Sequence, residues 1–235
     1  MNPAFSRFEA LIGEDGLKKL SSARVAVFGI GGVGGEAVMA LARSGIGHLD
    51  LIDHDVVAPS NINRQAVAFT DTIGQEKTEV MKEMVHRINP ECEVTVFNTF
   101  FLPGQEEDFP FAQYDYVIDA IDTLSAKIAL IQVCHQHNVP LVSCMGMGNK
   151  LHPECIEVGD IYQTTMDPLS KIVRQKLRKL GIPSLKVVYS KEPPLQANTE
   201  ETPSKGKKTV PGSSPFVPPA AGLTLASVVV QDLLG

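Results

Sequence analysis

The chain has 235 residues, of which 43% are hydrophobic and 20% are charged, and its formal net charge at pH 7 is −6. It is long enough to bury a full core. Its acidic balance excludes a protein whose whole surface binds polyanions, so any contact with nucleic acid requires a local basic patch. The four cysteines show no C-x-x-C spacing, which argues against a zinc site and a secreted disulfide framework. The N-terminus lacks the pattern of a signal peptide, so we expect a cytoplasmic protein.

Apolar runs alternate with helical patterns over the first two thirds of the chain, as expected of βαβ units. The predicted strands are residues 24–28, 49–53, 94–98, 116–120 and 140–143. The predicted helices between them are residues 34–44, 75–88 and 123–137. This alternation predicts an α/β fold with a doubly wound, Rossmann-like, mostly parallel sheet.

After residue 144 the pattern changes to a C-terminal extension of strands and helices. Asp167 and Gly181 have the positions of the two caps of a helix over 168–180, and residues 187–189 form a predicted strand. Residues 192–219 hold seven of the sixteen prolines and predict a flexible crossover. We therefore expect a single domain over 1–235, with a nucleotide-binding core at about 20–150, a substrate-binding extension at about 151–191 and a closing helix at about 220–235.

A glycine-rich loop follows the first predicted strand, with Gly29, Gly31, Gly32 and Gly34 before the first predicted helix of the core. Such a loop lets the backbone and the helix N-terminus approach phosphates closely. Asp53 ends the second strand, where a carboxylate accepts hydrogen bonds from ribose hydroxyls. The alternative is a glycine turn that serves only close packing of helix and strand.

A polar cluster follows, and it is one that a hydride-transfer enzyme has no need of. Asn61, Asn63, Arg64 and Gln65 lie within five positions, and Lys77 stands near the start of a helix. Amide, guanidinium and ammonium groups suit a triphosphate from which pyrophosphate departs. The cluster therefore predicts that ATP is cut at its α-phosphate, and the alternative is a solvated polar loop.

Two aspartates, Asp119 and Asp122, flank a turn at the end of the fourth predicted strand. The carboxyl ends of parallel strands border the ligand crevice, so Asp119 or Asp122 is a candidate to hold Mg²⁺ against the phosphates. For Asp122 the alternative is that it caps the following helix.

These residues resemble the ubiquitin-activating-enzyme-like adenylyltransferases, in which comparable side chains surround ATP. The resemblance implies a cofactor-binding set that consists of Gly29, Gly31, Gly32, Gly34, Asp53, Asp55, Asn61, Asn63, Arg64, Gln65, Lys77, Asp119 and Asp122. It assigns catalytic roles to Arg64, Lys77 and Asp119. It also assigns one to Arg7, which in many members reaches the partner's ATP and so implies a homodimer.

Within that superfamily the sulfur-carrier activators usually hold zinc with paired C-x-x-C motifs, which this chain lacks. Segments 145–151, 167–169 and 188–192 instead look like the tRNA threonylcarbamoyladenosine dehydratases. That family uses ATP to cyclise a modified adenosine beside the anticodon. The resemblance therefore implies ATP, Mg²⁺ and tRNA, and it leaves open a monovalent cation and a cysteine desulfurase partner. Activation of a sulfur-carrier or ubiquitin-like protein is the alternative function, and nicotinamide-dependent redox chemistry is the third.

Residues 168–191 carry seven basic and no acidic side chains, a local reversal of the overall charge. This pattern suits contacts with an RNA backbone, and a solvated helix face is the alternative. The candidate RNA-binding residues are Lys171, Arg174, Lys176, Arg178 and Lys179. Residues 220–234 are mostly apolar but shorter than the roughly 20 residues that span a bilayer. We expect a packed helix there, with membrane association only if a natural chain continues beyond Gly235.

Overall fold

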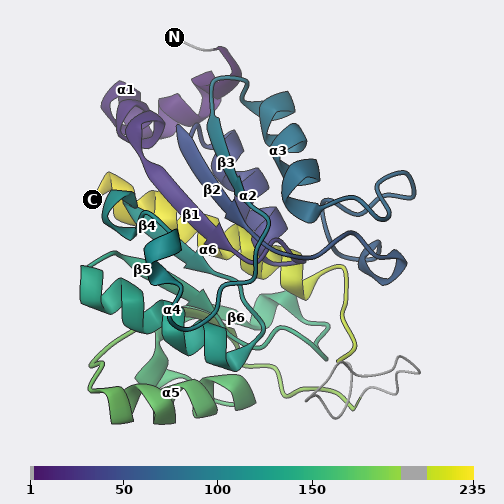
Figure 1. The fold of residues 1–235 in the computed structure, drawn as a ribbon, viewed down its shortest axis with the longest axis vertical. Coiled ribbons are helices and arrows are strands. Elements are labelled where there is room, and N and C mark those ends of the chain that lie inside the picture. Colours follow the sequence, from purple (N-terminus) through teal and green to yellow (C-terminus); the bar gives the residue numbers. More distant parts are fainter. Residues whose placement is uncertain (1–2, 197–210) are drawn as a thin grey trace.

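The computed structural model describes residues 3–196 and 211–235, so part of the predicted crossover lies outside the described residues. The described residues form one seven-stranded sheet in the order β3-β2-β1-β4-β5-β7-β6 (Figure 1). All neighbouring pairs are parallel except β6 and β7, which are antiparallel. The strands are β1 (Arg24–Phe28), β2 (His48–Ile52), β3 (Glu93–Phe97), β4 (Tyr116–Asp119), β5 (Leu141–Cys144), β6 (Ile156–Asp160) and β7 (Lys186–Ser190).

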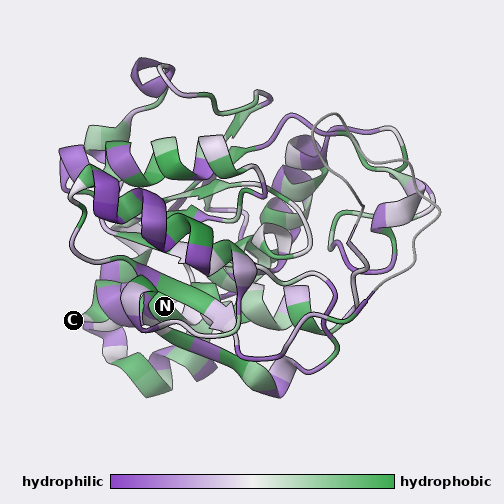
Figure 2. Cartoon of the chain, turned by 90° about the horizontal axis from the view of Figure 1, so that it is seen from below, coloured by the Kyte–Doolittle hydropathy of each residue, from purple (hydrophilic) through white to green (hydrophobic). Residues whose placement is uncertain are grey.

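Helices cover both faces of this sheet, as a parallel sheet requires. They are α1 (Ser6–Ser22), α2 (Gly34–Arg43), α3 (Lys77–Ile88), α4 (Leu124–His137), α5 (Pro168–Leu180) and α6 (Val217–Leu234). The α2, α3 and α6 helices pack on one face, and α4 packs on the other together with a cluster of phenylalanines. Figure 2 shows helices striped in hydrophobic and hydrophilic residues.

Strand β1 shows why the chain folds in this way. Val25 and Val27 point into the core beneath α2 and α6, while Ala26 and Phe28 point into the core beneath α4, and all four side chains are fully buried. Because side chains alternate along a strand, β1 contributes apolar residues to two separate cores, one on each face of the sheet. The predicted doubly wound, mostly parallel sheet is confirmed.

The order of the strands creates a switch point between β1 and β4. The chain leaves β1 toward β2 on one side, and β4 returns to pair with the other side of β1. In such a sheet the carboxyl ends of these two strands leave a crevice between diverging connections. Both the glycine loop after β1 and the aspartate turn after β4 open into it.

The closing helix α6 packs tightly against the start of α2. A Cβ atom at Gly222 would lie 2.2 Å from the carbonyl oxygen of Val33, so only glycine allows this approach. Leu225 and Val229 are fully buried in the same core. By length and composition α6 is apolar enough to cross a membrane, but half of it is buried inside the protein. Its packing here is that of a core helix.

Three features of the fold differ from the prediction. Helix α1 was not predicted, and Gly13, with φ of +76°, interrupts its helical pattern. The edge strand β6 was also not predicted, since it mixes polar and apolar residues and contains Gly159. Helix α6 begins at Val217 rather than near 220, because Pro218 and Pro219, two of the seven prolines that suggested a loop, lie in its first turn, where proline is tolerated.

Candidate functional site

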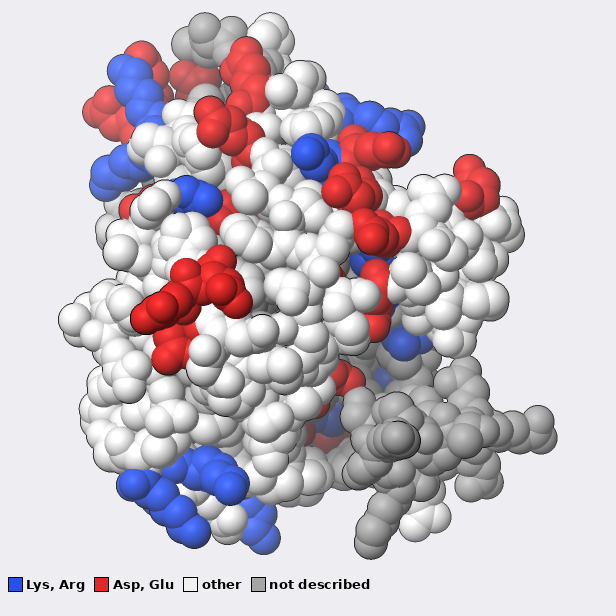
Figure 3. Space-filling model, in the orientation of Figure 1, with Lys and Arg blue, Asp and Glu red and all other residues white. Residues whose placement is uncertain are grey.

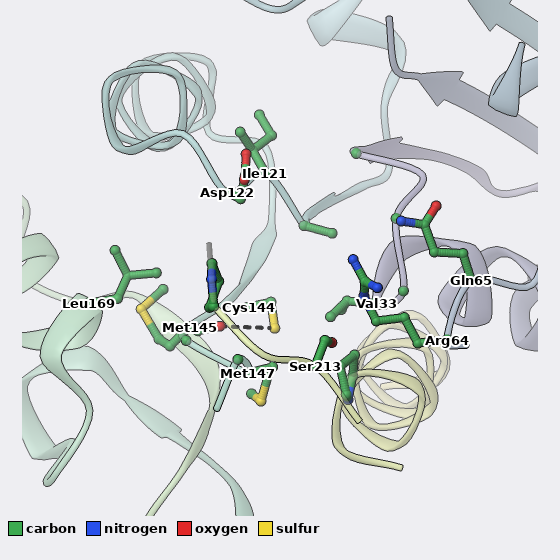
Figure 4. Close-up of a pocket in the computed structure, with 18 of the residues that line it drawn as sticks. Val33, Arg64, Gln65, Ile121, Asp122, Cys144, Met145, Met147, Leu169 and Ser213 are labelled. Atoms are coloured by element: carbon green, nitrogen blue, oxygen red, sulfur yellow. Dashed lines mark hydrogen bonds between the residues drawn. The ribbon is translucent and has the colours of Figure 1, made fainter. Parts of the chain in front are cut away.

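A cavity of about 720 Å³ lies at the carboxyl ends of β1, β4 and β5. Figure 4 shows Arg64 and Gln65 on one side of it and Met145, Met147 and Leu169 on the other, with Asp122 between them. The cavity therefore has two walls of different chemistry. We call the side with the glycine loop and Arg64 the phosphate half, and the side with Met145, Met147 and Leu169 the acceptor half.

The glycine loop uses its glycines for different purposes. Gly29 has φ of +95°, and a Cβ there would lie 2.8 Å from the carbonyl oxygen of Ala120. A Cβ at Gly34 would lie 1.8 Å from the carbonyl oxygen of Gly29, whereas a Cβ at Gly31 would meet no atom within 4 Å. Gly29, Gly31 and Gly32 line the cavity. Gly34 is absent from its lining, so the structure assigns it to the packing of helix against strand.

Asp53 and Lys77 line the phosphate half of the cavity. Asp53 accepts hydrogen bonds from the backbone N–H of Ile30 at 2.6 Å and of Asp55 at 2.8 Å, which fixes its carboxylate beside the loop. Lys77 begins α3, and its Nζ lies 2.8 Å from Asp55 Oδ2. The Lys77 side chain is only 5% exposed while that of Asp55 is 50% exposed. The pair thus presents a buried ammonium to the cavity.

The segment after β2 supplies the polar wall. Arg64 Nη1 donates to the carbonyl oxygen of Ser60 and to Asn63 Oδ1, both at 2.8 Å, so the guanidinium is held in place before any ligand arrives. Gln65 Oε1 is buried and has no hydrogen-bond partner within the described part of the chain. Such an atom favours a ligand that donates a hydrogen bond to it.

Asn61 and Asn63 differ in their positions. Asn61 lines the cavity and accepts a hydrogen bond from the Ala58 N–H at 3.0 Å. Asn63 does not line it; its Nδ2 donates to the carbonyl oxygen of Ser213 at 2.8 Å. Asn63 therefore ties the polar wall to the segment before α6, and its cofactor role stays a prediction.

The two aspartates after β4 also differ in their positions. Asp119 is fully buried, and its Oδ2 accepts hydrogen bonds from Lys127 Nζ at 2.7 Å and Ser143 Oγ at 2.5 Å. It does not line the cavity, so the structure does not support a catalytic or metal-binding role for it. Asp122 does line the cavity. Helix α4 takes the next residue, Thr123, as its N-cap residue.

The cysteine at the cavity, Cys144, is a buried free thiol. It is buried at the end of β5, and burial raises its pKa to about 12. A thiol in that state is protonated near neutral pH and is a poor nucleophile. Within the described residues, the one group of three metal-ligand side chains is Asp53, His54 and Asp55, which includes no cysteine.

Helix α5 begins at the cavity and carries basic residues away from it. Asp167 caps the helix by accepting from the Ser170 N–H at 2.7 Å, and Gly181 ends it in a left-handed conformation, as predicted. Figure 3 shows a cluster of Lys and Arg side chains at the lower edge of the molecule, where α5 lies in Figure 1. Lys171, Lys176 and Lys179 are exposed on this helix.

The two arginines of α5 have structural partners. Arg174 is half-buried, and its Nη1 donates to Ile161 O, Thr164 O and Thr164 Oγ1 at 2.7 to 3.1 Å. Arg178 lies over the ring of Tyr162 at 5.4 Å. Arg174 therefore holds the loop before α5, and its role in binding RNA stays a prediction. Arg178 remains exposed while it stacks.

Arg7 lies on α1, is exposed and does not line the cavity of its own chain. Sequence reasoning also missed two buried lysines, Lys127 beneath the aspartate turn and Lys150 in the acceptor half. Each one pairs with an aspartate from another element, Lys127 with Asp119 and Lys150 with Asp167. A lysine on the apolar stripe of α4 was the signal for the first pair. Lys150 and Asp167 lie in segments 145–151 and 167–169, which the resemblance singled out, but nothing in the sequence indicated that the two side chains pair.

The flanks of the crossover return to the rim of the acceptor half. Asn149 adopts a left-handed conformation with φ of +59°. Its backbone N–H donates to Gly212 O at 2.7 Å, while its own O and Oδ1 accept from the N–H groups of Leu195 and Gly212 at 2.7 and 2.6 Å. One residue thus joins the loop after β5 to both ends of the described crossover.

A nucleotide crevice of this kind, with a glycine loop, an acidic residue after β2 and a polar arginine loop, occurs in a known class of proteins. The model of the ThiF family matches residues 5–176, which is more than half of the chain. The molybdopterin-synthase adenylyltransferase of Escherichia coli strain K12 is 37% identical over 129 residues, with 55% of this chain and 51% of that protein covered.

Another group of relatives matches over a much greater length. The tRNA threonylcarbamoyladenosine dehydratase of Bacillus subtilis strain 168 is 43% identical over 239 residues, covering 98% of this chain and 94% of that protein. The crystal structure of the E. coli tRNA N6-threonylcarbamoyladenosine dehydratase, TcdA, in complex with ATP superposes with a TM-score of 0.88. Its sequence is 36% identical, with 98% of this chain and 93% of that chain covered. The chain therefore belongs to the ThiF family, in its branch of tRNA threonylcarbamoyladenosine dehydratases.

Proposed function

We propose that the protein uses ATP to dehydrate threonylcarbamoyladenosine next to the anticodon of tRNA, closing the modification into its cyclic form. The observation that carries this proposal is a cavity in which a phosphate half opens directly into an acceptor half. A carboxylate held in the acceptor half can therefore meet the α-phosphate of ATP without leaving the cavity. The similarity of the chain to named dehydratases over nearly its whole length supports the same conclusion.

The residues of the phosphate half suit an adenylation step. The threonyl carboxylate would attack the α-phosphorus, and the bond to pyrophosphate would break. Arg64, Lys77 and the N–H groups of the glycine loop would stabilise the charge on the pentacovalent phosphorus and on the leaving group. Their positions support this role, because Arg64 is held by two hydrogen bonds and Lys77 is buried.

In the second step, no side chain of the protein needs to form a covalent bond with the substrate. The ureido group of the substrate would attack the acyl carbon of the adenylate, the bond to AMP would break, and the proton of the ureido group would pass to solvent. The net change is the loss of one water from the substrate, with ATP converted to AMP and pyrophosphate. The raised pKa of the buried Cys144 thiol agrees with a route that lacks a cysteine nucleophile.

Asp122 is our candidate to hold Mg²⁺ in this cavity. Asp122 lines the cavity and offers a carboxylate, the kind of oxygen ligand that Mg²⁺ prefers. Bound there with the phosphates of ATP, Mg²⁺ would neutralise charge on the departing pyrophosphate. Asp119 is committed to Lys127 and Ser143 and is excluded from this proposal.

We propose that the tRNA binds along α5. A tRNA substrate also agrees with a reaction that takes place in the cytoplasm. Lys171, Lys176 and Lys179 are exposed on a helix whose first turn lines the acceptor half. Phosphates bound by these lysines would hold the RNA while the modified base is splayed into the cavity.

We also propose that the protein acts as a homodimer in which Arg7 serves the partner's cavity. Arg7 is exposed on α1 and does not line its own cavity. A hollow between the start of α1, α2 and α3 is lined by apolar side chains that include Phe5, Met39 and Met84, together with Arg43 and Arg87. A hollow of mixed apolar and basic side chains near the start of α1 offers a surface for the contact of two copies.

The decisive experiment treats tRNA that carries threonylcarbamoyladenosine with the protein and ATP and analyses its nucleosides by mass spectrometry. We expect a product lighter by one water, formed together with AMP and pyrophosphate, and absent with Arg64→Ala. Circular dichroism would establish that this variant folds. Pyrophosphate exchange that requires a small carrier protein rather than tRNA would instead support activation of a sulfur-carrier or ubiquitin-like protein.

A further inference from the structure

The acceptor half contains a buried ion pair that the proposed adenylation does not use. Lys150 lies in the loop after β5 and Asp167 precedes α5, and both residues line the cavity. Their side chains are 1% and 2% exposed, and Lys150 Nζ lies 3.7 Å from Asp167 Oδ1. Among the described residues that line the acceptor half, these two are the charged ones. Charged groups are seldom buried at a cavity unless they are paired or meet a polar ligand.

The hydrogen bonds of the pair leave one donor group and one acceptor atom available. Lys150 Nζ donates to the Gly146 carbonyl oxygen at 2.6 Å, which uses one of its three protons. Asp167 Oδ2 accepts from Ser170 N–H at 2.7 Å, from Ser170 Oγ at 2.6 Å and from Gly146 N–H at 3.4 Å. Asp167 Oδ1 accepts none of the hydrogen bonds described for this carboxylate. Its contact with Lys150 is longer than a hydrogen bond.

Gly146 keeps the space beside that oxygen open. A Cβ atom at this position would lie 2.6 Å from Asp167 Oδ1, closer than any side chain can be accommodated without movement. Met145 and Met147, on either side of Gly146, supply apolar surface in the same half (Figure 4). The acceptor half therefore offers a donor and an acceptor next to each other within an apolar wall.

We infer that the Lys150–Asp167 pair binds the ureido group of the substrate, an inference that rests on the proposed function. A urea offers a carbonyl oxygen and N–H groups side by side, which match the Lys150 ammonium and Asp167 Oδ1. The apolar wall then contacts the neighbouring base and aliphatic atoms of the substrate. With the ureido group fixed here, the threonyl carboxylate is directed toward the phosphate half, where Arg64 and Lys77 lie.

The charges of the pair disfavour a carboxylate or a phosphate at this position, and so disfavour the threonyl carboxylate of the substrate. A carboxylate or a phosphate offers only acceptor atoms, so it would face Asp167 Oδ1 with like charge and without a proton between them. An apolar group would leave the donors of Lys150 without partners at a buried site. Of these kinds of group, a neutral amide or urea satisfies both side chains.

The test measures how strongly the protein prefers tRNA with threonylcarbamoyladenosine over the same tRNA without it. Equilibrium binding is measured with an ATP analogue that cannot be cleaved between the α- and β-phosphates, so that the substrate is not consumed. We expect Lys150→Met to lower this preference by ~10-fold or more, because a hydrogen bond to a charged group is removed. Binding of the unmodified tRNA and of the ATP analogue should stay within about twofold of wild type.

Two further variants separate recognition from folding. Asp167→Asn keeps a side chain that caps α5 well, but it removes the charge and places an amide in the pocket, so the preference should fall in the same way. Lys186→Met is the matched control. It removes a lysine that starts β7 and pairs with Asp232, outside the lining of the cavity, and it should leave the preference unchanged. If Lys150→Met and Asp167→Asn keep the wild-type preference, the inference is wrong. If wild type itself neither prefers nor converts the modified tRNA, the proposed function fails instead.

Discussion

Lys77 is held at the cavity by Asp55, through the ion pair of their side chains and a hydrogen bond from the Lys77 N–H to the Asp55 carbonyl oxygen. Because Asp55 is half-exposed, its carboxylate stays hydrated when the lysine is removed, and the fold should be destabilised little. We predict that Lys77→Met lowers the rate of AMP formation by ~100-fold or more, since the variant has no positive charge near the leaving phosphates at this position. The measurement is kcat for AMP release at saturating ATP.

Lys82→Met, on the same helix but outside the lining of the cavity, provides the matched control. Both variants should unfold within a few degrees of wild type. A Lys77 variant that turns over as fast as the Lys82 variant would remove Lys77 from the adenylation step.

The glycine loop offers a matched pair of substitutions with opposite expected effects. A methyl group at Gly31 meets nothing in the protein, so Gly31→Ala should change the free energy of unfolding by within ~0.5 kcal/mol. It should weaken ATP binding by ~10-fold or more, because the methyl group occupies the space that phosphates need. Gly34→Ala places a methyl group 1.8 Å from a backbone oxygen and should destabilise the fold by ~3 kcal/mol or more.

Urea denaturation and calorimetric titration with ATP measure the two quantities separately. If Gly31→Ala binds ATP as tightly as wild type, the phosphates do not lie against this residue. If Gly34→Ala is as stable as wild type, the helix and strand do not pack as closely as the structure indicates.

At the scale of elements, α5 divides its basic residues between two tasks. Lys171→Ala and Lys179→Ala should each weaken tRNA binding and reduce the slope of log K against log salt by about 0.7 to 0.9 for each phosphate that the variant no longer binds. Arg174→Ala removes three hydrogen bonds to the loop before the helix and should lower the melting temperature instead. Filter binding over a salt series and thermal unfolding distinguish these outcomes. Lysine variants with an unchanged slope would return α5 to the status of a solvated helix face.

The anchoring of α6 to the sheet predicts a dependence of stability on pH. Asp232 accepts hydrogen bonds from Lys186 at 2.7 and 2.5 Å and from Tyr116 at 2.6 Å. Burial raises the pKa of Asp232, but the hydrogen bonds from Lys186 and Tyr116 outweigh it and hold the pKa below the ordinary value of 3.8. The ionised carboxylate therefore stabilises the fold above that value, and this stability is lost as pH falls through the lowered pKa.

Asp232→Asn tests this dependence. The gap in melting temperature between wild type and this variant should stay constant from about pH 5 to pH 8 and shrink below about pH 4. A gap that persists at pH 3 would mean that the carboxylate stabilises α6 by a route other than its charge.

Elements were predictable where their signals were local. Both ends of α5 were correct because Asp167 and Gly181 are caps that adjacent residues determine. The strands of the core shifted by one residue at most, since each contains a short apolar run, which in the edge strand β3 alternates with polar residues and is only partly buried. Strand β6 had no such run, because an edge strand that pairs on one side needs less apolar surface, and only its antiparallel pairing with β7 defines it.

At the scale of the whole molecule, the site was predictable only in part for the same reason. The glycine loop, Asp53, Arg64 and Lys77 belong to short motifs and line the cavity. Lys150 and Asp167 are seventeen positions apart in the sequence, and only the packing of α5 against the loop after β5 brings them together. The burial of Asp119 and the outward position of Asn63 likewise depend on tertiary contacts that no motif encodes.

Assembly of two copies leads to a prediction that single sites cannot make. If Arg7 completes the partner's cavity, Arg7→Ala and Arg64→Ala homodimers should each be inactive, the first for lack of the reaching arginine and the second for lack of the arginine in the cavity. A heterodimer of the two variants contains one intact site, because the cavity with Arg64 receives Arg7 from the other subunit. Random exchange makes half of the dimers mixed, so activity should recover to about 25% of wild type.

Activity is measured after the two variants are mixed under conditions that allow subunits to exchange, with each variant alone as the baseline. The double variant Arg7→Ala/Arg64→Ala, mixed with wild type, gives the matched control, because its heterodimers contain two sites that each lack one arginine. Recovery in the first mixture, with no activity beyond that of the remaining wild-type dimers in the second, is the signature of a shared site. An Arg7→Ala protein that is fully active alone, or a first mixture that stays inactive, would show that each cavity is complete within its own chain.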